Sequence, residues 1–320
     1  MELNKATKEA LFSEINRGII SHAYIIEGMA GVGKRSFAAA AAKAILCTGN
    51  VKPCGVCSSC LKCDAGTHPD LHRYGAEGNS FKVEAVRDIK RAVTLTPNDG
   101  DRAVYILERA DTMTVSAQNA LLKVFEEPPK GTTFLLLAEK RESLLATVRS
   151  RGRVIRLSTV DDDSLLAMLA ERFPKAADAE LREAVRIAEG SLGKAEAVLK
   201  KEGKAERDNA LKLCAAIYGD GDRYSLYSAF LGQMRKRDAL IPVIDALAQA
   251  ARDVLVHKLA CGKSTLLTEE AAAEHAEGAT ADTLYEIFDA VLECGRSLRR
   301  NTDPLTAVSE LCTRINRAKG

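Results

Sequence analysis

Hydrophobic residues in the first half of the chain gather into short runs that alternate with helical patterns. Four apolar runs are predicted to be strands, at 22–27, 102–108, 132–138 and 152–158. Apolar residues with helical spacing lie between or beside them, at 34–47, 82–94, 114–127 and 141–148. Nearly continuous apolar strands separated by helices are typical of a parallel sheet that is covered on both faces. Residues 1–160 are therefore predicted to form an α/β domain.

Beyond residue 160 the strand signals stop, and apolar residues recur at i, i+3, i+4 and i+7. Glycine-containing breaks at Gly190-Ser191 and at Gly203 interrupt the nearer part of this region. We expect a small helical domain at 161–205 and a larger helical domain at 206–320.

Length and composition fit this division. The chain has 320 residues, 46% of them hydrophobic and 28% charged, which is an ordinary globular profile with room for more than one domain. A net charge of +2 is too small to predict attraction of the whole chain to nucleic acid. No apolar run approaches the roughly 20 residues that span a bilayer, and the N-terminus lacks the apolar segment of a signal peptide. A cytoplasmic protein with no membrane partner is expected.

A glycine-rich loop joins the first predicted strand to the helix at 34–47. Its residues match the phosphate-binding pattern G-x-x-x-x-G-K-[ST] up to the lysine. In such a loop, backbone N–H groups and the helix N-terminus hold phosphate oxygens, and the lysine reaches the outer phosphates. The candidate nucleotide-binding residues are Gly28, Gly31, Gly33, Lys34 and Ser36. The alternative is a glycine turn that only packs the helix against the sheet.

Arg35 stands where a working NTPase carries the hydroxyl that binds Mg²⁺. Ser36 follows one residue later and therefore points about 100° away around the helix. The strand at 102–108 leads into Glu108 and Arg109, where catalysis requires an acidic pair, and a guanidinium is never a general base near neutral pH. ATP or ADP is the candidate ligand, but Mg²⁺ binding and efficient hydrolysis are not expected.

Five of the nine cysteines lie between residues 47 and 63. Three successive C-x-x-C steps and one more distant cysteine suit a closed tetrahedral thiolate site for structural Zn²⁺. Five candidates compete for four places, and an iron–sulfur cluster or free thiols are the alternatives. His68 is a further candidate ligand, although its His-Pro-Asp context favours a loop that leads into a strand.

Several segments together resemble the clamp-loader subunits of bacterial DNA polymerase III, a family of the AAA+ class. They are HAYIIEG at 22–28, AGTHPD at 65–70, SAQNALLKVFEEPP at 116–129 and LLATVRSRGR at 144–153, and EGSLGKAEAVL at 189–199 is similar to the lid of these proteins. The resemblance implies an AAA+ P-loop core at 1–160 with an inserted zinc module at 47–66, a helical lid and a helical collar domain. By position, the family's zinc ligands correspond to Cys47, Cys54, Cys57 and Cys60, with Cys63 as the spare or a substitute.

The family also carries a Ser-Arg-Cys motif whose arginine reaches the ATP site of a neighbouring subunit. Here it reads Ser150-Arg151-Gly152, so the arginine is present and the cysteine is not. The resemblance implies that Arg151 is an arginine finger acting in trans; a solvated or helix-capping arginine is the alternative. At the C-terminus, 299–315 resembles the closing collar helix. Its apolar residues predict either an interface or a core, and are Leu305, Val308, Leu311 and Ile315.

Three functions are compatible with these features. The first is a non-motor clamp-loader subunit in a hetero-pentamer with gamma/tau and delta subunits, which helps to load the sliding clamp onto primer–template DNA. The second is an active gamma/tau-type motor ATPase, which requires the hydroxyl and the acidic pair that are missing. The third, a free-standing zinc-containing nucleotide sensor, has no positive support. A predicted basic helix offers phosphate contacts to DNA, or a solvated face, through Lys82, Arg87, Lys90 and Arg91.

Overall fold

A computed structural model describes residues 4–75, 81, 83–219, 223–231 and 236–319. Contacts divide the chain into two units. One comprises Met1–Ser164 together with Gly190–Gly193, and the other Leu165–Glu189 together with Lys194–Gly320. Most of the predicted small helical domain is thus grouped with the C-terminal helices, and the boundary at 205/206 stays a prediction.

The first unit is built on a five-stranded parallel sheet in the order β2-β3-β4-β1-β5. Its three central strands are β1 (Ala23–Glu27), β3 (Ala103–Leu107) and β4 (Thr132–Ala138). Apart from half-buried Glu27, every residue of these strands is buried, as their near-continuous apolar sequences predict. The α/β fold class with a parallel sheet, followed by helical parts, is confirmed.

The two edge strands differ in how clearly their sequences predict a strand. β5 (Arg153–Arg156) lies within the apolar run predicted as a strand at 152–158, whereas β2 (Leu71–Tyr74) was not predicted. β2 reads LHRY and none of its residues is fully buried, so it carries no apolar run. It is held instead by parallel pairing with β3 and by His72, whose ring stacks on Tyr105 at 4.7 Å.

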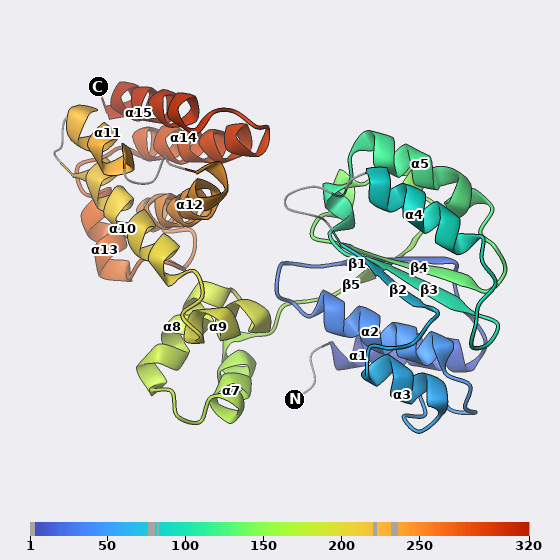
Figure 1. Ribbon diagram of the computed structural model, residues 1–320. Helices are drawn as coiled ribbons and strands as arrows, with labels where there is room; N and C mark the ends of the chain where they lie inside the picture. The colour runs from blue at the N-terminus through green and yellow to red at the C-terminus, as the bar shows by residue number, and fades with distance from the viewer. Residues whose placement is uncertain (1–3, 76–80, 82, 220–222, 232–235, 320) are drawn as a thin grey trace. The chain divides into compact units, whose positions relative to one another are not determined.

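Helices cover both faces of this sheet (Figure 1). α1 (Lys5–Asn16) and α2 (Lys34–Leu46) share a core with one face, and α4 (Val83–Val93) and α5 (Val115–Glu126) share a core with the other. Successive strand residues point to opposite faces. Ile25 accordingly belongs to the core under α5, and the next residue, Ile26, to the core under α2.

The predicted helix at 141–148 is wrong as a single element. The structure has a 3₁₀ turn, η2 (Arg141–Ser143), then an extended Leu144-Leu145 pair and a short helix, α6 (Ala146–Arg149). Leu144 is buried in the core under α5, and the backbone N–H of Leu145 donates to Gln118 Oε1 at 2.7 Å. A tertiary contact therefore replaces a helical hydrogen bond at this point.

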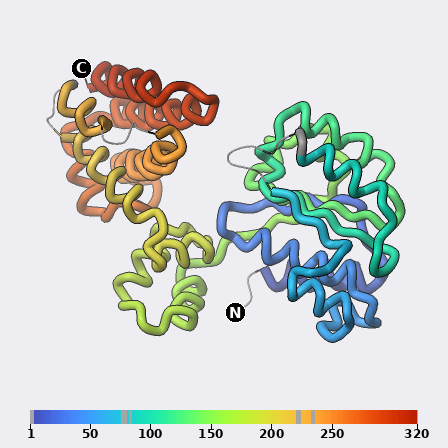
Figure 2. Tube along the Cα trace, in the orientation of Figure 1, coloured from blue at the N-terminus to red at the C-terminus, as the bar shows by residue number. Residues whose placement is uncertain are grey.

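The second unit consists of helices and the loops between them, with no strand among its described residues (Figure 2). Its helices are α7 (Asp162–Arg172, whose residues 162–164 are grouped with the first unit), α8 (Asp178–Ala188), α9 (Leu192–Leu199, whose residues 192–193 are grouped with the first unit), α10 (Lys204–Tyr218), α11 (Arg223–Leu231), α12 (Arg237–Leu259), α13 (Glu269–Ala276), α14 (Ala281–Arg299) and α15 (Pro304–Lys319). Buried aliphatic residues of α10, α12, α14 and α15 form one continuous core. Among the described residues, no helix has the length and hydrophobicity that crossing a membrane requires.

A fully buried carboxylate organises the loop between α12 and α13. Asp253 accepts the backbone N–H groups of Thr265, Leu266 and Leu267 at 2.8, 2.6 and 3.0 Å. Arg186 of α8 donates to the carbonyl oxygens of Thr265 and Leu267 from the other side. A buried charge is tolerated only when it is hydrogen-bonded in this way. The contacts join a helix of the predicted lid to the C-terminal helices.

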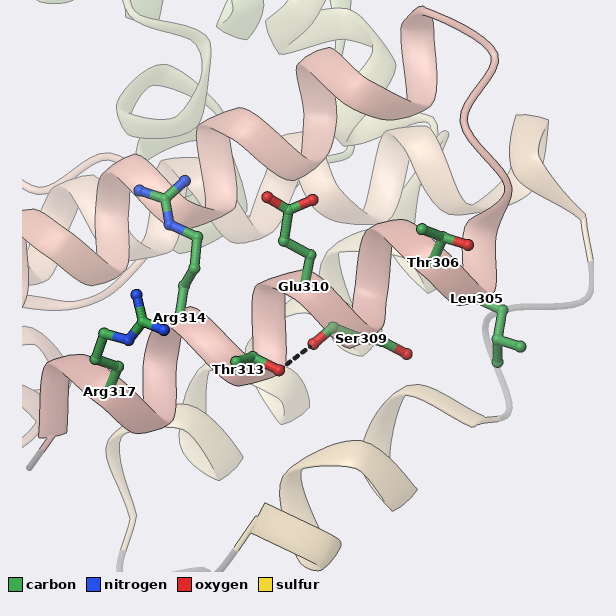
Figure 3. Close-up of a pocket in the computed structure, with 7 residues that line it drawn as sticks. All are labelled: Leu305, Thr306, Ser309, Glu310, Thr313, Arg314 and Arg317. Atoms are coloured by element: carbon green, nitrogen blue, oxygen red, sulfur yellow. Dashed lines mark hydrogen bonds between the residues drawn. The ribbon is translucent and has the colours of Figure 1, made fainter.

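The C-terminal helix α15 separates its apolar residues into two groups. Val308, Leu311 and Ile315 are buried in the helical core, and Leu305 is 53% exposed. The core interpretation therefore holds for three of the four residues. The outer face of α15 carries a shallow hollow of about 650 Å³ (Figure 3), lined by Leu305, Thr306, Ser309, Glu310, Thr313, Arg314 and Arg317.

Candidate functional site

Four cysteines of the inserted module lie together, with all their sulfur atoms within 4.8 Å of one another; they are Cys47, Cys54, Cys57 and Cys60. The Cys47–Cys57 and Cys54–Cys60 sulfur distances are 3.9 and 4.0 Å. Four thiolates bound to one zinc ion at its usual bond length and tetrahedral angle lie about 3.8 Å apart. The geometry of the four sulfurs thus fits a closed zinc site without large movement.

Backbone N–H donors point at three of the four sulfurs, those of Cys47, Cys54 and Cys57, whereas burial raises the pKa of the Cys60 thiol to about 12. Cys47 Sγ accepts N–H groups from Gly49 and Cys54 at 3.3 and 3.4 Å, and Cys57 Sγ accepts that of Cys60 at 3.4 Å. Burial opposes ionisation of Cys57, yet N–H donors from Cys60 and Thr48 outweigh it and lower the pKa of this thiol to about 5. Thiolates are the form that binds zinc.

A short helix, a glycine and a contact to α1 hold the cysteine module in its compact conformation. Cys57 caps the N-terminus of a short helix, α3 (Ser58–Asp64), which the sequence analysis did not predict. A side chain at Gly49 would place its Cβ 2.9 Å from Cys54 Sγ, so glycine lets the loop close around the sulfurs. Asn16 of α1 makes two hydrogen bonds to the backbone of Lys52, which fixes the loop to α1.

The fifth cysteine and the nearby histidine lie outside this cluster. Cys63 is half-buried against the core under α2, and burial raises the pKa of its thiol to about 11. His68 is buried, and its Nδ1 accepts the backbone N–H of Asp70, one residue before β2. His68 therefore belongs to a loop that leads into a strand, and the structure brings neither residue into the four-sulfur cluster.

The glycine-rich loop directly follows β1 at the carboxyl edge of the sheet, where open α/β sheets bind ligands. Gly31 and Gly33 have φ values of +75° and +96°, which side chains rarely adopt. Lys34 turns back on this loop, and its ammonium donates to the carbonyl oxygens of Gly28 and Met29 at 2.6 and 2.8 Å. Ser36 is exposed on the first turn of α2.

A segment from far along the chain lies against the same loop. Ser191 Oγ donates to Ala30 O at 2.8 Å, and the N–H of Gly193 donates to Gly31 O at 3.0 Å. A Cβ at Gly193 would lie 2.9 Å from Gly31 Cα, so glycine at position 193 is needed for this approach. In the sequence, residues 189–199 are marked by their resemblance to the lid and by the break at Gly190-Ser191, and no local pattern reveals a contact over this separation.

Arg35 forms an ion pair with Glu108, with 2.6 Å between Nη2 and Oε2. Glu108 follows β3 directly, and its side chain is only 17% exposed. Arg35 is the residue that departs from the catalytic pattern, and Glu108 is the acidic residue that remains of it. Their opposite charges neutralise each other. Arg109 occupies a left-handed conformation at φ +54° and begins the short turn η1 (Ala110–Thr112).

Arg151 lies just after α6, at the surface of the first unit. Its Nη2 is 2.8 Å from Glu126 Oε1, and its Nη1 donates to Thr147 O at 2.8 Å and to Ser150 Oγ at 3.4 Å. The side chain remains 34% exposed. A Cβ at Gly152 would lie 2.7 Å from Ile25 Cγ1 in β1, which explains why this chain carries glycine where the motif has cysteine.

Gln118 is a structural residue of this region that the sequence analysis did not single out. Its side chain is 2% exposed, accepts the N–H of Leu145 at 2.7 Å and donates to Met113 O and Ser143 O. It thereby connects α5 to the extended pair that precedes α6. A polar residue within an apolar helical pattern was the available signal, since buried polar side chains need partners.

The predicted basic face on α4 is described only in part, because Lys82 lies outside the described residues. Arg87 and Arg91 are exposed and Lys90 is half-buried. Arg91 also lies 3.8 Å from Asp88, so part of the positive charge is balanced. Contact with DNA through this helix stays a prediction.

Comparison with known proteins agrees with this geometry. A family model described as "DNA polymerase III, delta subunit" matches residues 3–161. The chain is 33% identical over 225 residues to DNA polymerase III subunit delta' of Escherichia coli (strain K12), which covers 69% of this chain and 67% of the relative. It is also 33% identical over 172 residues to subunit delta' of Bacillus subtilis (strain 168), which covers 53% and 52%. The tau subunit of Escherichia coli (strain K12) is 30% identical over 238 residues, covering 67% of this chain and 37% of tau.

The match spans about half the length of the Bacillus subtilis relative and two thirds of the Escherichia coli relative. The family model covers the α/β unit, including the cysteine module, the glycine-rich loop and Arg151. With 33% identity extending over two thirds of an established member, this chain belongs to the DNA polymerase III delta' family.

Proposed function

We propose that this chain is a non-motor subunit of a bacterial replicative clamp loader, which assists ATP-dependent loading of the sliding clamp onto primed DNA without hydrolysing ATP efficiently itself. The observation that carries the proposal is the 2.6 Å ion pair between Arg35 and Glu108. It rests further on membership of the delta' family. Its partners are gamma/tau and delta subunits in a hetero-pentamer, the clamp and primer–template DNA.

The ion pair is incompatible with the usual way in which P-loop enzymes use Mg²⁺. These enzymes hold the ion through a hydroxyl after the lysine and through acidic residues at the end of a neighbouring strand. Here a guanidinium takes the place of the hydroxyl and engages the remaining carboxylate. Lys34, which would have to reach the outer phosphates, is bonded to carbonyl oxygens of its own loop. Nucleotide binding by Gly28, Gly31, Gly33, Lys34 and Ser36 is therefore not required for the proposed role.

The contribution of this chain to ATP hydrolysis is proposed to be Arg151, acting in trans. A guanidinium supplied by a neighbouring protein stabilises charge that develops on the transferred phosphoryl group, and it needs no working nucleotide site in its own chain. Arg151 is partly exposed at the end of α6, and two of its five N–H donors, the Nε–H and one Nη2–H, are not used by hydrogen bonds among the described residues.

A structural Zn²⁺ ion is proposed to hold the cysteine module together. The spacing of the sulfurs of Cys47, Cys54, Cys57 and Cys60 supports four thiolate ligands, and backbone N–H donors reach the first three of them. Because four protein ligands leave no open position, the ion would stabilise the module and take no part in catalysis. The lid at 161–205 and the collar at 206–320 complete the proposed architecture.

The test is the steady-state ATPase rate, measured first for the purified chain and then for the reconstituted complex. We expect negligible turnover by the chain alone, and a fall of about tenfold or more in the complex when Arg151→Ala replaces the wild-type chain. Vigorous hydrolysis by the isolated wild-type chain would instead support the gamma/tau-type motor, an alternative that the 30% identity to tau keeps in view.

A further inference from the structure

Glu126 is the acidic group that holds the guanidinium of Arg151. Its Oε1 lies 2.8 Å from Arg151 Nη2, while Thr147 O and Ser150 Oγ accept from Nη1. The two side chains come from different elements, since Glu126 is the last residue of α5 and Arg151 follows α6. The contact therefore ties the orientation of Arg151 to α5.

The end of α5 that carries Glu126 is rigidly anchored. The preceding residue, Phe125, is 3% exposed, and its ring meets that of Phe134 in β4 edge to face, at 5.1 Å and 89°. Gln118, two turns earlier in α5, holds the backbone on both sides of Leu144 through its bonds to Ser143 O and Leu145 N. The segment that leads to Arg151 is thus fixed to α5 at one end by Gln118 and at the other by Glu126.

Glu126 orients the guanidinium without withdrawing it. Nη2 makes one bond and Nη1 makes two, so the Nε–H and one Nη2–H have no hydrogen bond among the described residues. Guanidinium donors of this kind bind phosphate oxygens. The pair is also partly solvated, with 34% of Arg151 and 45% of Glu126 exposed, so its strength is that of a surface ion pair.

We propose that Glu126 is the positioning residue for Arg151: it restricts the rotamers of the arginine so that its remaining donors already face outward before a neighbouring subunit's ATP arrives. This inference rests on the proposed trans role of Arg151. Pre-organising a flexible side chain lowers the entropy lost when it engages the transition state. Glu126 touches neither ATP nor phosphate in this role.

The chain offers a matched control one residue away. Glu127 is also exposed and carries the same charge, and it ends the helix without any ion pair among the described residues. Replacing Glu127 by glutamine therefore changes the local charge by the same amount as Glu126→Gln and leaves the contact to Arg151 in place.

The experiment compares the clamp- and DNA-stimulated ATPase of complexes reconstituted with wild-type chain, Glu126→Ala, Glu126→Gln, Glu127→Gln, Arg151→Ala and the Glu126→Ala/Arg151→Ala double variant. We expect Glu126→Ala to lower kcat about threefold with KM for ATP unchanged, the rate equivalent of an exposed ion pair. Glu126→Gln, which keeps an acceptor, should recover part of that loss, and Glu127→Gln should match wild type. In the Arg151→Ala background, Glu126→Ala should have no further effect.

The outcomes separate this inference from the proposed function. If Arg151→Ala leaves the rate unchanged, the trans role itself is wrong. If Arg151→Ala lowers the rate but Glu126→Ala does not, or if Glu126→Ala raises it, Glu126 does not position the arginine. A double variant slower than Arg151→Ala alone would also overturn the inference, because the additional loss would not act through Arg151. Unfolding temperatures of the purified variants verify that each chain is folded.

Discussion

Arg35 and Glu108 are joined by an ion pair of 2.6 Å that links the start of α2 to the end of β3. Arg35 is 71% exposed, whereas the carboxylate of Glu108 is only 17% exposed. The pair joins the two positions, after the loop lysine and after β3, at which the phosphate-binding pattern of P-loop enzymes requires magnesium ligands.

The strength of this pair is measurable by a double-mutant cycle with Arg35→Ala and Glu108→Ala. We expect a coupling free energy of about 0.5–1 kcal/mol in urea unfolding, which decreases as salt is added, because one partner is solvated. The pair of Arg91 and Asp88, 3.8 Å apart and exposed on both sides, is the control and should show no coupling. Equal coupling in the two cycles would contradict the structural importance of Arg35.

Metal content should distinguish the clustered cysteines from the spare one. We expect about one zinc ion per wild-type chain and per Cys63→Ser chain, and much less in Cys54→Ser. Cys54 belongs to the four-sulfur cluster, whereas Cys63 does not. Elemental analysis after dialysis gives the ratio, and thermal unfolding should show a lower midpoint for Cys54→Ser alone. Loss of zinc from Cys63→Ser would place Cys63 among the ligands.

Alkylation of Cys63 should depend steeply on pH. Burial raises the pKa of this thiol to about 11, so only about one molecule in a thousand carries the reactive thiolate at pH 8. Between pH 8 and 10 the thiolate fraction, and hence the rate of modification by iodoacetamide, should increase about tenfold per pH unit. Peptide mass spectrometry of the zinc-loaded chain measures this rate. A rate that is already maximal at pH 8 would show that the thiol is not shielded.

Gly152 should resist conversion to the cysteine of the family motif. In Gly152→Cys the new Cβ would lie 2.7 Å from Ile25 Cγ1, and we expect a loss of about 1–3 kcal/mol in the free energy of unfolding. Ile25→Ala alone should cost about 2–5 kcal/mol through a cavity in the core. The double variant should lose less than the sum, since the added side chain enters the vacated space. Simple additivity would mean that the two positions do not interfere.

Removing the charge of Asp253 should destabilise the helical unit strongly. Asp253→Asn loses an acceptor oxygen and brings two N–H donors toward the backbone N–H groups of residues 265–267. We expect a loss of about 2–5 kcal/mol in urea unfolding. Asp238→Asn, at a position 79% exposed near the start of α12, should stay within about 0.5 kcal/mol of wild type. Similar losses in the two variants would contradict a special role for Asp253.

The sequence by itself determined the central strands, the helical second half and the identity of the candidate site residues. Buried strands of a parallel sheet must be apolar along their whole length, and phosphate loops and zinc ligands are close together in sequence, so their spacing alone reveals them. The missed strand β2 lies at a sheet edge, where pairing with β3 substitutes for an apolar run. The helix expected at 141–148 is interrupted because Gln118 captures the backbone of Leu145.

Only the tertiary structure decided which of these residues meet. It left Cys63 outside the cluster of the other four cysteines, as the family resemblance implied, turned Lys34 toward its own loop, and brought Glu126 to Arg151 and Arg35 to Glu108. It also brought Gly193 within hydrogen-bonding distance of Gly31. Local patterns record which face of a helix or strand is apolar, whereas contacts between residues far apart in the chain depend on how whole elements pack, which no short stretch of sequence encodes.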